Sequence, residues 1–308
     1  MEYGAHLPLM DFGGHPYRLD HLTGYAERAS QLGFTALAAN DHVVHEAPWL
    51  DGPTALAAVL DHSAAMTLAT TVSLPVVRGP VLLAKTLGSL DRLSGGRMVV
   101  AVGPGSSERD YAAVGIDFAE RWKRLDEAVG VLRVLWAGNG KPFVGDYYST
   151  EGIDLRPRPG ADGGPPIWIG SWGSQVGLNR VARLGDGWLA SAYNTTPEGF
   201  AQAWDGLAGR LQASGKDPHA FPNALATMWC YITDDHAEAD RILRQRVLPV
   251  VNRSEDELRA RLPIGPPGAF AERLAAYRDA GVQRVYLWPV ADEVHQLELF
   301  AERVVPLL

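Results

Sequence analysis

Hydrophobic and polar positions alternate along the chain in two ways. Short runs of Val, Ile, Leu, Ala and Trp are separated by longer segments in which apolar residues recur every three or four positions. The first pattern predicts buried β-strands. The second predicts amphipathic helices, such as one over residues 19–32 that ends before Gly33. The predicted strands lie near residues 3–9, 34–40, 66–76, 97–105, 165–171, 185–192, 224–233 and 282–290.

Each predicted strand is followed by helical sequence, and this strict alternation indicates an α/β protein with a parallel sheet. Eight strand–helix units favour a closed (β/α)8 TIM barrel over an open sheet. The Pro- and Gly-rich segment at residues 137–165 interrupts the alternation and predicts a small hairpin insertion. No change in composition marks a second domain, so residues 1–308 are expected to form a single barrel domain.

Composition and charge narrow the range of partners. The chain has 308 residues, 46% hydrophobic and 21% charged, with a formal net charge of −8. Because it lacks a concentrated block of Lys and Arg, we expect no nucleic-acid partner. No segment approaches the roughly 20 apolar residues that span a bilayer, and the first residues do not resemble a signal peptide. We therefore expect no membrane contact, a cytoplasmic location and a small-molecule substrate.

The residues that directly follow the predicted strands carry the candidate chemistry, because barrel enzymes place their active sites at the carboxyl ends of the strands. Small, aromatic and ionisable residues gather there, and this composition suits a flat cofactor that lies across the barrel mouth. These residues include His6, Asp41, His42, Thr71, Val72, Gly103, Gly105, Ser106, Gly170, Ser171, Trp172, Gly173, Ser174, Ala190 and Trp288.

Asp41 and His42 are the candidate catalytic residues. A histidine can donate or accept a proton near neutral pH, and the adjacent Asp41 can hydrogen-bond a cofactor ring or bias the histidine. A structural interpretation stays open, in which Asp41 caps a turn and His42 is a buried histidine with satisfied hydrogen bonds. His42 and His45 do not form an HExxH motif, and no Cys/His cluster completes a site, so no metal is expected.

Two glycine-rich segments follow strands. Residues 170–174, GSWGS, lead into a predicted helix, whose free amides and dipole attract an anion. The segment therefore indicates either a phosphate-binding site or ordinary capping of the helix by Ser174. The other segment, GPGSSERD at residues 103–110, lacks the full Gly-x-Gly-x-x-Gly spacing of a dinucleotide site.

Several segments together resemble the luciferase-like superfamily. They are LDRLSGGRMVVAVGPG (90–105), PPIWIGSWG (165–173), RVARLGDGWLA (180–190) and FAERLAAYRDAGVQRVYLWP (270–289), and the resemblance covers essentially the whole chain. One group of that superfamily binds reduced FMN and activates oxygen, whereas the other binds the deazaflavin coenzyme F420 and transfers hydride. Asp41-His42 resembles the pair of the deazaflavin group, because flavin members often carry Glu-His there.

The resemblance implies a coenzyme F420-dependent oxidoreductase that exchanges a hydride with a small organic substrate. It places Asp41 near the cofactor ring and His42 beside the substrate, as acid or base. The segment TTVSLPV (70–76) resembles one that carries a non-proline cis peptide, here Thr71–Val72, which supports the ring. The implied cofactor contacts are Asp41, Thr71, Val72 and Gly103 at the ring, Gly170, Ser171, Trp172, Gly173 and Ser174 at the phosphate, and Gly105 and Ala190.

Two positions depart from the deazaflavin-dependent alcohol and sugar-phosphate dehydrogenases. Those enzymes have a Trp four residues after the His, where this chain has Glu46, and a Glu after the Gly-x-Gly of the fourth strand, where it has Ser106. A different substrate pocket is therefore expected, and its candidate residues are His6, Glu46, Trp49, Ser106, Glu108 and Trp288. An ordinary surface role for Glu46, Glu108 and Trp49 stays open.

Two other functions stay open at this point. One is an FMN-dependent luciferase-like monooxygenase, and the other is a non-catalytic barrel that binds a flavin without turnover. Binding of FMN in place of coenzyme F420 would indicate the monooxygenase. Tight cofactor binding without turnover would indicate the non-catalytic barrel. A homodimer is the expected assembly, since dimers are the commonest soluble oligomers and are common in this superfamily.

Overall fold

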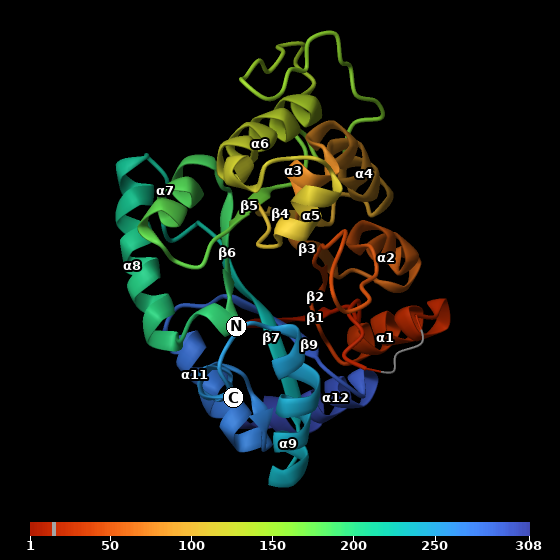
Figure 1. Ribbon diagram of the computed structural model, residues 1–308, viewed down its shortest axis with the longest axis vertical. Helices are drawn as coiled ribbons and strands as arrows, with labels where there is room; N and C mark the ends of the chain where they lie inside the picture. The colour runs from red at the N-terminus through yellow and green to blue at the C-terminus, as the bar shows by residue number, and fades with distance from the viewer. Residues whose placement is uncertain (14–16) are drawn as a thin grey trace.

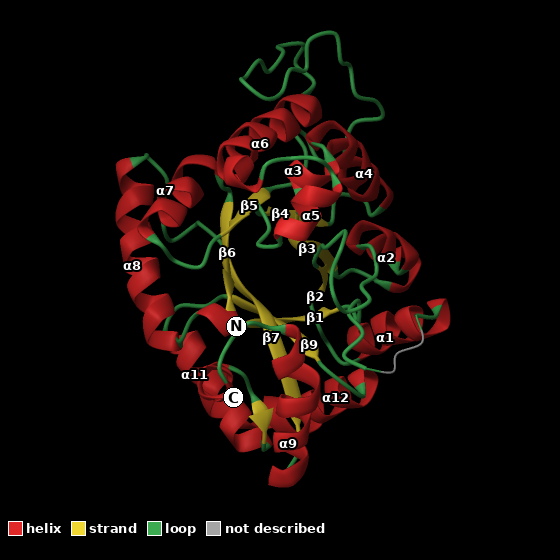
Figure 2. Ribbon diagram, in the orientation of Figure 1, coloured by secondary structure: helices red, strands yellow, loops and turns green. Residues whose placement is uncertain are grey.

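The strands form one parallel sheet that closes on itself. The computed structural model describes residues 1–13 and 17–308. Its sheet runs in the order β6-β5-β4-β3-β2-β1-β9-β7, and pairing of β6 with β7 closes the ring (Figures 1 and 2). The ring strands are β1 (Glu2–His6), β2 (Ala36–Ala39), β3 (Thr67–Ser73), β4 (Met98–Val102), β5 (Ile167–Gly170), β6 (Gly187–Ser191), β7 (Asn223–Ile232) and β9 (Arg284–Pro289), and the short β8 (Ile264–Gly265) pairs with β7 outside the ring.

Helices surround this ring on the outside, as Figure 2 shows in red. They supply the second layer that a barrel of parallel strands requires, because such strands are buried on both faces. The helices are α1 (Leu19–Gln31), α2 (Gly52–Ala58), α3 (Pro75–Arg78), α4 (Pro80–Leu93), α5 (Glu108–Ala113), α6 (Arg121–Ala137), α7 (Gln175–Leu184), α8 (Pro197–Ala213), α9 (His236–Ile242), α10 (Glu255–Arg261), α11 (Pro267–Asp279) and α12 (Glu293–Leu299). No helix in the described ranges is long and apolar enough to cross a membrane.

The predicted (β/α)8 barrel is confirmed, and all eight predicted strands are present, each ending before its predicted carboxyl end. The strand predicted over residues 66–76 stops at Ser73, because Pro75 begins the short helix α3. The strand predicted over residues 97–105 stops at Val102, where the glycine-rich segment leaves the sheet. The residues lost from the predicted strand ends form the rim of the barrel mouth.

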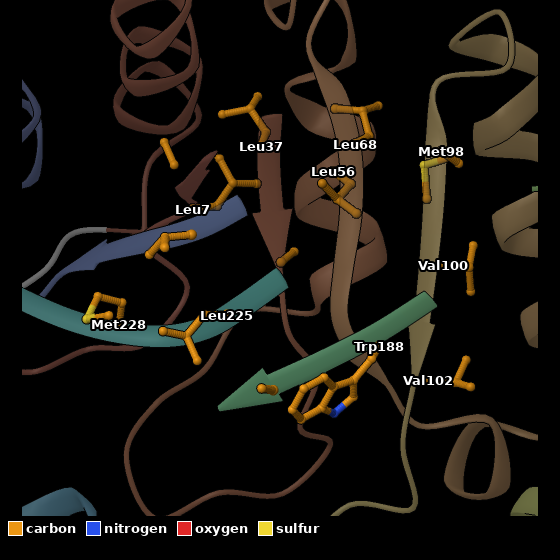
Figure 3. Close-up of a cluster of buried hydrophobic side chains, with 14 of the residues drawn as sticks. Leu7, Leu37, Leu56, Leu68, Met98, Val100, Val102, Trp188, Leu225 and Met228 are labelled. Atoms are coloured by element: carbon orange, nitrogen blue, oxygen red, sulfur yellow. The ribbon is translucent and has the colours of Figure 1, made fainter. Parts of the chain in front are cut away.

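Strand side chains alternate between two buried layers. The barrel interior is filled mainly by small residues from many strands, such as Ala36, Ala69, Ala101 and Ala224. The large ring of Tyr286 packs with them. The larger aliphatic residues point outward and pack against the helices. Figure 3 shows part of this outer layer, including Leu37, Leu68, Val100 and Leu225. The barrel is therefore a packed core, and only its mouth is open to a ligand.

The insertion between α6 and β5 is mostly loop, drawn in green at the top of Figure 2. The predicted hairpin is reduced to a tight turn with one antiparallel bridge, Val144–Ser149. Carboxylate oxygens of Glu127 on α6 accept the backbone amides of Asp146, Tyr147 and Tyr148, at 2.8 to 3.1 Å. This turn is therefore fixed to α6, on the outside of the barrel.

Candidate active site

A cavity of about 390 Å³ lies at the carboxyl ends of the barrel strands. Its wall is formed by residues at or directly after the carboxyl ends of β2, β3, β4, β5 and β6 and by residues in the middle of β7, together with the start of α6. Of the residues predicted from the sequence, those that line it are Asp41, His42, Thr71, Val72, Gly103, Gly105, Ser106, Gly170, Ser171, Trp172, Ser174 and Ala190. The structure thus brings together segments that are far apart in the chain.

His42 lines this cavity and is held by a residue that sequence analysis did not identify. Its Nδ1 lies 2.8 Å from Oδ2 of Asp110, which is on α5 and almost completely buried. The other carboxylate oxygen of Asp110 accepts the backbone amides of Val43 and Val44, at 2.9 and 2.7 Å. One carboxylate therefore fixes both the histidine ring and the chain that follows it.

The charge state of Asp110 decides which nitrogen of His42 carries the proton. Burial alone would raise the pKa of the Asp110 carboxyl, but the hydrogen bonds from His42 and from the amides of Val44 and Val43 lower it below its ordinary value. Asp110 is thus an ionised carboxylate, which only accepts hydrogen bonds. His42 must then donate through Nδ1–H, and its Nε2 is the nitrogen left for proton transfer.

Asp41 is buried and engaged in an ion pair. Both of its carboxylate oxygens accept hydrogen bonds from the guanidinium of Arg78, and Oδ2 also accepts the amide of Leu74 at 3.3 Å. Arg78 reaches Asp51 as well, and although burial opposes its charge, these two carboxylates raise its pKa. Asp41 is therefore a fixed carboxylate in the cavity wall, and a role for it as a second acid or base finds no support in this geometry.

Glycines keep one side of the cavity flat. A Cβ added at Gly103 would lie 2.9 Å from a methyl carbon of Val72, and one added at Gly170 would lie 2.8 Å from the other. The Thr71–Val72 peptide bond is cis, as the family resemblance implied. Gly105 has a φ of +77°, a conformation that side chains other than glycine rarely adopt. Backbone and small side chains therefore form this wall.

Three polar side-chain atoms near the ends of β2 and β3 have no hydrogen-bond partner in the described parts of the chain. Oγ1 of Thr71, Oδ1 of Asn40 and Oγ of Ser73 are buried and have no hydrogen-bond partner among the described residues. Thr71 and Asn40 both line the cavity. Buried polar atoms are nearly always hydrogen-bonded, so atoms left unpaired beside a cavity indicate that a ligand or water supplies the partner.

The start of α7 forms another part of the wall. Ser174 caps this helix by accepting the amide of Gly177 at 3.2 Å, so the capping interpretation is confirmed, and Oγ of Ser171 accepts the amide of Gly173 at 3.3 Å. Both serines also line the cavity, whereas Gly173 is absent from its lining. Arg121 lines it too, with its guanidinium 3.9 Å from the ring centre of Phe118. An anionic group at this end would meet two hydroxyls, a helix N-terminus and a cation.

The predicted substrate-pocket residues separate into two sets. His6 stacks on Trp288, Trp288 contacts Trp49, and Trp49 contacts His42. None of His6, Trp49 and Trp288 lines the cavity itself. Glu46 and Glu108 do not line the cavity, which corrects that expectation. Glu46 is exposed and pairs with Arg109 at 3.0 Å, and Glu108 is exposed in the first turn of α5, where a carboxylate is stabilised by the helix dipole and by water.

Sequence analysis missed Asp110 and Arg121 for different reasons. Asp110 lies in the segment GPGSSERD, but nothing local indicates that it turns back to residue 42, which is 68 positions away. Arg121 is the first residue of α6, before the apolar positions of that helix, and in the sequence it resembles an ordinary first-turn residue. In the described ranges, no group of His, Cys, Asp and Glu could hold a metal ion.

Comparisons with known proteins place the chain in a family. A sequence profile described as luciferase-like monooxygenase matches residues 6–261. The F420-dependent hydroxymycolic acid dehydrogenase of Mycobacterium tuberculosis is 27% identical, over 95% of this chain and 85% of that protein.

Two solved structures share the fold, each with a TM-score of 0.86. One is an F420-dependent secondary alcohol dehydrogenase in complex with an F420–acetone adduct, 20% identical over 100% of this chain and 99% of the other. The second is a monooxygenase from Streptomyces bottropensis, 24% identical over 99% of both chains. With the profile spanning most of the sequence and the barrel mouth built as described, the chain belongs to the luciferase-like monooxygenase family.

Proposed function

We propose that this protein is a coenzyme F420-dependent oxidoreductase that transfers a hydride between the deazaflavin and a small organic substrate. The observation that carries the proposal is His42 at the cavity, held by the buried carboxylate of Asp110 beside a wall of glycines and unpaired polar atoms. The relative from Mycobacterium tuberculosis, which aligns with 95% of this chain, is named for the same coenzyme.

The residues present fit such a cofactor. Gly103 and Gly170 add no side chain to the cavity wall around Val72, so a flat ring can approach this wall closely. The unpaired oxygens of Thr71 and Asn40 match a ring edge that carries N–H and carbonyl groups. Ser171, Ser174 and Arg121 would hold the phosphate, as hydroxyl donors and a counter-charge. The remaining predicted contacts, Trp172, Gly105 and Ala190, would close the rim.

When bound, the deazaflavin would supply or accept a hydride at its C5 atom. His42 manages the accompanying proton. In the reducing direction, Nε2–H of its imidazolium donates to the carbonyl oxygen of the substrate, which becomes an alcohol. In the oxidising direction, neutral Nε2 accepts the hydroxyl proton. Asp110 keeps Nδ1 protonated in both directions and stabilises the imidazolium, while Asp41 holds the cavity wall through Arg78.

Turnover by His42 variants tests this assignment. Purified protein is supplied with oxidised or reduced coenzyme F420 and a panel of alcohols and ketones, and cofactor absorbance is followed. We expect His42→Ala to lower turnover by ~10²–10⁴ while cofactor binding persists. His62→Ala is the matched control, because His62 is at the surface, paired with Glu27, and should leave the rate unchanged. A His42→Ala variant that turns over like the control would remove the histidine from the mechanism.

An FMN-dependent monooxygenase is the second candidate function. The family profile is described as monooxygenase, and one structure of the same fold is a monooxygenase. The cavity wall that fits a deazaflavin ring would also fit a flavin ring. Oxygen consumption with reduced FMN distinguishes this candidate, whereas cofactor binding with no turnover of any substrate would favour the non-catalytic barrel.

We further infer that the protein is a cytoplasmic homodimer, the expectation formed from its composition and from the prevalence of dimers. Light scattering after size exclusion tests the assembly, with an expected mass of twice the 33.3 kDa of one chain. A mass of one chain across the working concentration range would contradict it.

A further inference from the structure

One part of the cavity wall has no role in the cofactor contacts or the proton transfer described above. It is formed by the end of β6 and the middle of β7, and its lining residues are Ser191, Tyr193, Ala226 and Thr227. In the closed ring, β5, β4 and β3 separate β6 from β2 on one side, and β7, β9 and β1 separate them on the other (Figure 2). This wall therefore faces His42 across the barrel mouth.

Thr227 has a strained backbone. Its φ is +54°, in the left-handed region, which a β-branched residue very rarely adopts. The register of β7 against β9 shifts between Leu225 and Met228, so Thr227 lies where the strand is irregular. Such irregularities re-aim side chains beside active sites, and strained residues gather at functional sites. The strain therefore indicates that the placement of Thr227 at the cavity serves a function.

A chain of hydrogen bonds leads to Thr227 from outside the cavity. Arg253 donates to Oδ1 of Asn194 at 2.6 Å, and Nδ2 of Asn194 donates to Oγ of Ser191 at 3.0 Å. Oγ of Ser191 lies 2.7 Å from Oγ1 of Thr227. The hydroxyl of Thr227 donates in turn to the carbonyl of Ala226 at 2.7 Å. The chain thus joins a cation to two hydroxyls of the cavity wall.

The guanidinium at the far end fixes the direction of this chain. An arginine only donates hydrogen bonds, so the amide oxygen of Asn194 must face Arg253 and its NH2 group must face Ser191. Ser191 then accepts from Asn194 and donates its own proton to Thr227. Each bond polarises the next one along the chain. All the donors therefore point from Arg253 toward Thr227, whose own proton is held only by the carbonyl of the preceding residue.

The positive charges themselves do not reach the cavity. Arg253 also donates to the carbonyl of Asn252 at 2.8 Å. Its neighbour Arg261 donates to the carbonyl of Tyr193 at 3.0 Å and pairs with Glu257 at 3.4 Å. Neither guanidinium belongs to the cavity lining of the described chain. The wall therefore offers a ligand a hydroxyl proton, which suits an uncharged oxygen atom that accepts a hydrogen bond.

We propose that Thr227 and Ser191 form a binding site for a second oxygen atom of the substrate, remote from the carbon that exchanges the hydride. The hydroxyl of Thr227 turns from the carbonyl of Ala226 to this oxygen, while Ser191 continues to donate to Thr227. Arg253 and Asn194 are positioning residues, because they act through Ser191. The assignment rests on the proposed function and adds to it the polar group that the substrate must carry at its far end.

Uncharged ketones that differ by one ether oxygen test the proposal. Binding of 2-heptanone, propoxyacetone, 4-ethoxybutan-2-one and 5-methoxypentan-2-one to the purified protein is measured by calorimetry, with oxidised coenzyme F420 and without it. The three ethers keep the chain length of 2-heptanone and place an acceptor oxygen at increasing distances from the carbonyl group. We expect at least one ether to bind about three- to tenfold more tightly than 2-heptanone. Ethers that all bind no more tightly than 2-heptanone would overturn the proposal.

Thr227→Val locates the second oxygen. Valine keeps the branched shape of threonine but has no hydroxyl, so the preferred ether should lose its three- to tenfold advantage over 2-heptanone. Thr35→Val is the matched control, because Thr35 directly precedes β2 at the other end of the barrel, where its hydroxyl donates to the carbonyl of Tyr3. This control should keep the advantage. An advantage that survives in Thr227→Val would overturn the assignment.

Variants of Arg253 test the positioning role without touching the ligand. Arg253→Met removes the donor that orients Asn194, so the affinity ratio between the preferred ether and 2-heptanone should fall about threefold. Arg253→Lys keeps a donor and should retain part of this ratio. A purely structural role would weaken both ketones equally and leave the ratio unchanged, and that result would overturn the positioning role.

The two proposals fail separately in this design. An ether preference that depends on Thr227, found in a protein with no affinity for coenzyme F420, would defeat the proposed function alone. Affinity for coenzyme F420 without any ether preference would defeat the second-oxygen site alone.

Discussion

At the scale of single residues, the candidate chemistry depends on two buried carboxylates with different partners. Asp110 fixes His42 and the backbone that follows it, whereas Asp41 is bound to Arg78. The adjacent Asp41-His42 pair suggests in the sequence that the two residues act on each other. In the structure each has its own partner from a distant element, and the acid that orients the histidine is Asp110.

Replacing Asp110 with Asn should lower both turnover and stability. The amide does not offer two acceptor oxygens to His42 and the amides of Val43 and Val44, and charge-assisted hydrogen bonds of this kind contribute about 1.5–3 kcal/mol. Turnover should fall at least about tenfold, and the loss of free energy of unfolding should be about 1.5–3 kcal/mol near neutral pH.

The difference in free energy of unfolding between the wild type and Asp110→Asn should change with pH in one direction. Because the pKa of Asp110 is lowered in the folded protein, its stabilisation is complete above the ordinary carboxyl value of 3.8 and declines as the pH falls below it. Denaturant titrations at several pH values should show the two proteins converging in strongly acidic buffer. A stability difference that grows as the pH falls would contradict an ionised Asp110. Asp110→Glu keeps the carboxylate, so it should retain part of the turnover that Asp110→Asn loses.

His6 should contribute to acid unfolding. Its pKa falls from an ordinary value of 6.5 to about 3 on burial, so the unfolded chain takes up a proton between these values that the folded protein does not. Stability is therefore lost as the pH falls through this range, by up to about 1.4 kcal/mol per pH unit for one proton. His6→Phe should show a shallower decline than wild type, whereas the surface variant His62→Gln should not differ from wild type in this respect.

At the scale of elements, strand ends decide where the site lies, and glycines decide what fits there. Gly103, directly after β4, and Gly170, the last residue of β5, lie so close to Val72 of β3 that a methyl group added at either glycine would collide with it. Each glycine stands where a hydrophobic strand ends. The pattern was visible in the sequence, but the contact with Val72 required the closed barrel.

Gly170→Ala should therefore weaken cofactor binding and lower stability by about 1–3 kcal/mol, because the added methyl overpacks the wall. Gly209→Ala is the control, and it should change the stability in the opposite direction. Gly209 lies within α8 with nothing near its missing Cβ, so alanine there should stabilise the protein by up to about 1 kcal/mol. Thermal unfolding measures the stability of both variants, and titration measures their cofactor affinity. Equal stability and equal affinity in the two variants would contradict close packing of the cavity wall at Gly170.

The N-terminus of α7 is expected to bind the phosphate, and Ser171→Asp tests this element. A carboxylate at that position would repel the phosphate, so affinity for coenzyme F420 should fall by at least about tenfold. Ser149→Asp adds the same charge on the exposed turn outside the barrel and should have no effect. Unchanged affinity in Ser171→Asp would remove the α7 segment from the cofactor site.

At the scale of the whole molecule, periodicity predicted the architecture well and long-range contacts poorly. Eight hydrophobic strands separated by amphipathic helices permit few arrangements, and the barrel rule then directs attention to strand ends such as Asp41, Thr71 and Ser171. The short helices α3 and α5 were missed, because a few residues carry no periodic signal. Asp110 lies on α5 and was missed with it. Arg121, the first residue of the predicted helix α6, was missed because its position in the helix does not show that it lines the barrel mouth.

Cofactor selectivity is the most direct test of the central claim. The purified protein is titrated with coenzyme F420 and with FMN, each in oxidised and reduced form, and binding is followed by fluorescence. The account predicts selective binding of the deazaflavin and loss of affinity in Ser171→Asp. Selective binding of reduced FMN would contradict it and assign the chain to the oxygen-activating members of its family, and binding of neither cofactor would contradict the interpretation of the barrel mouth as a cofactor site.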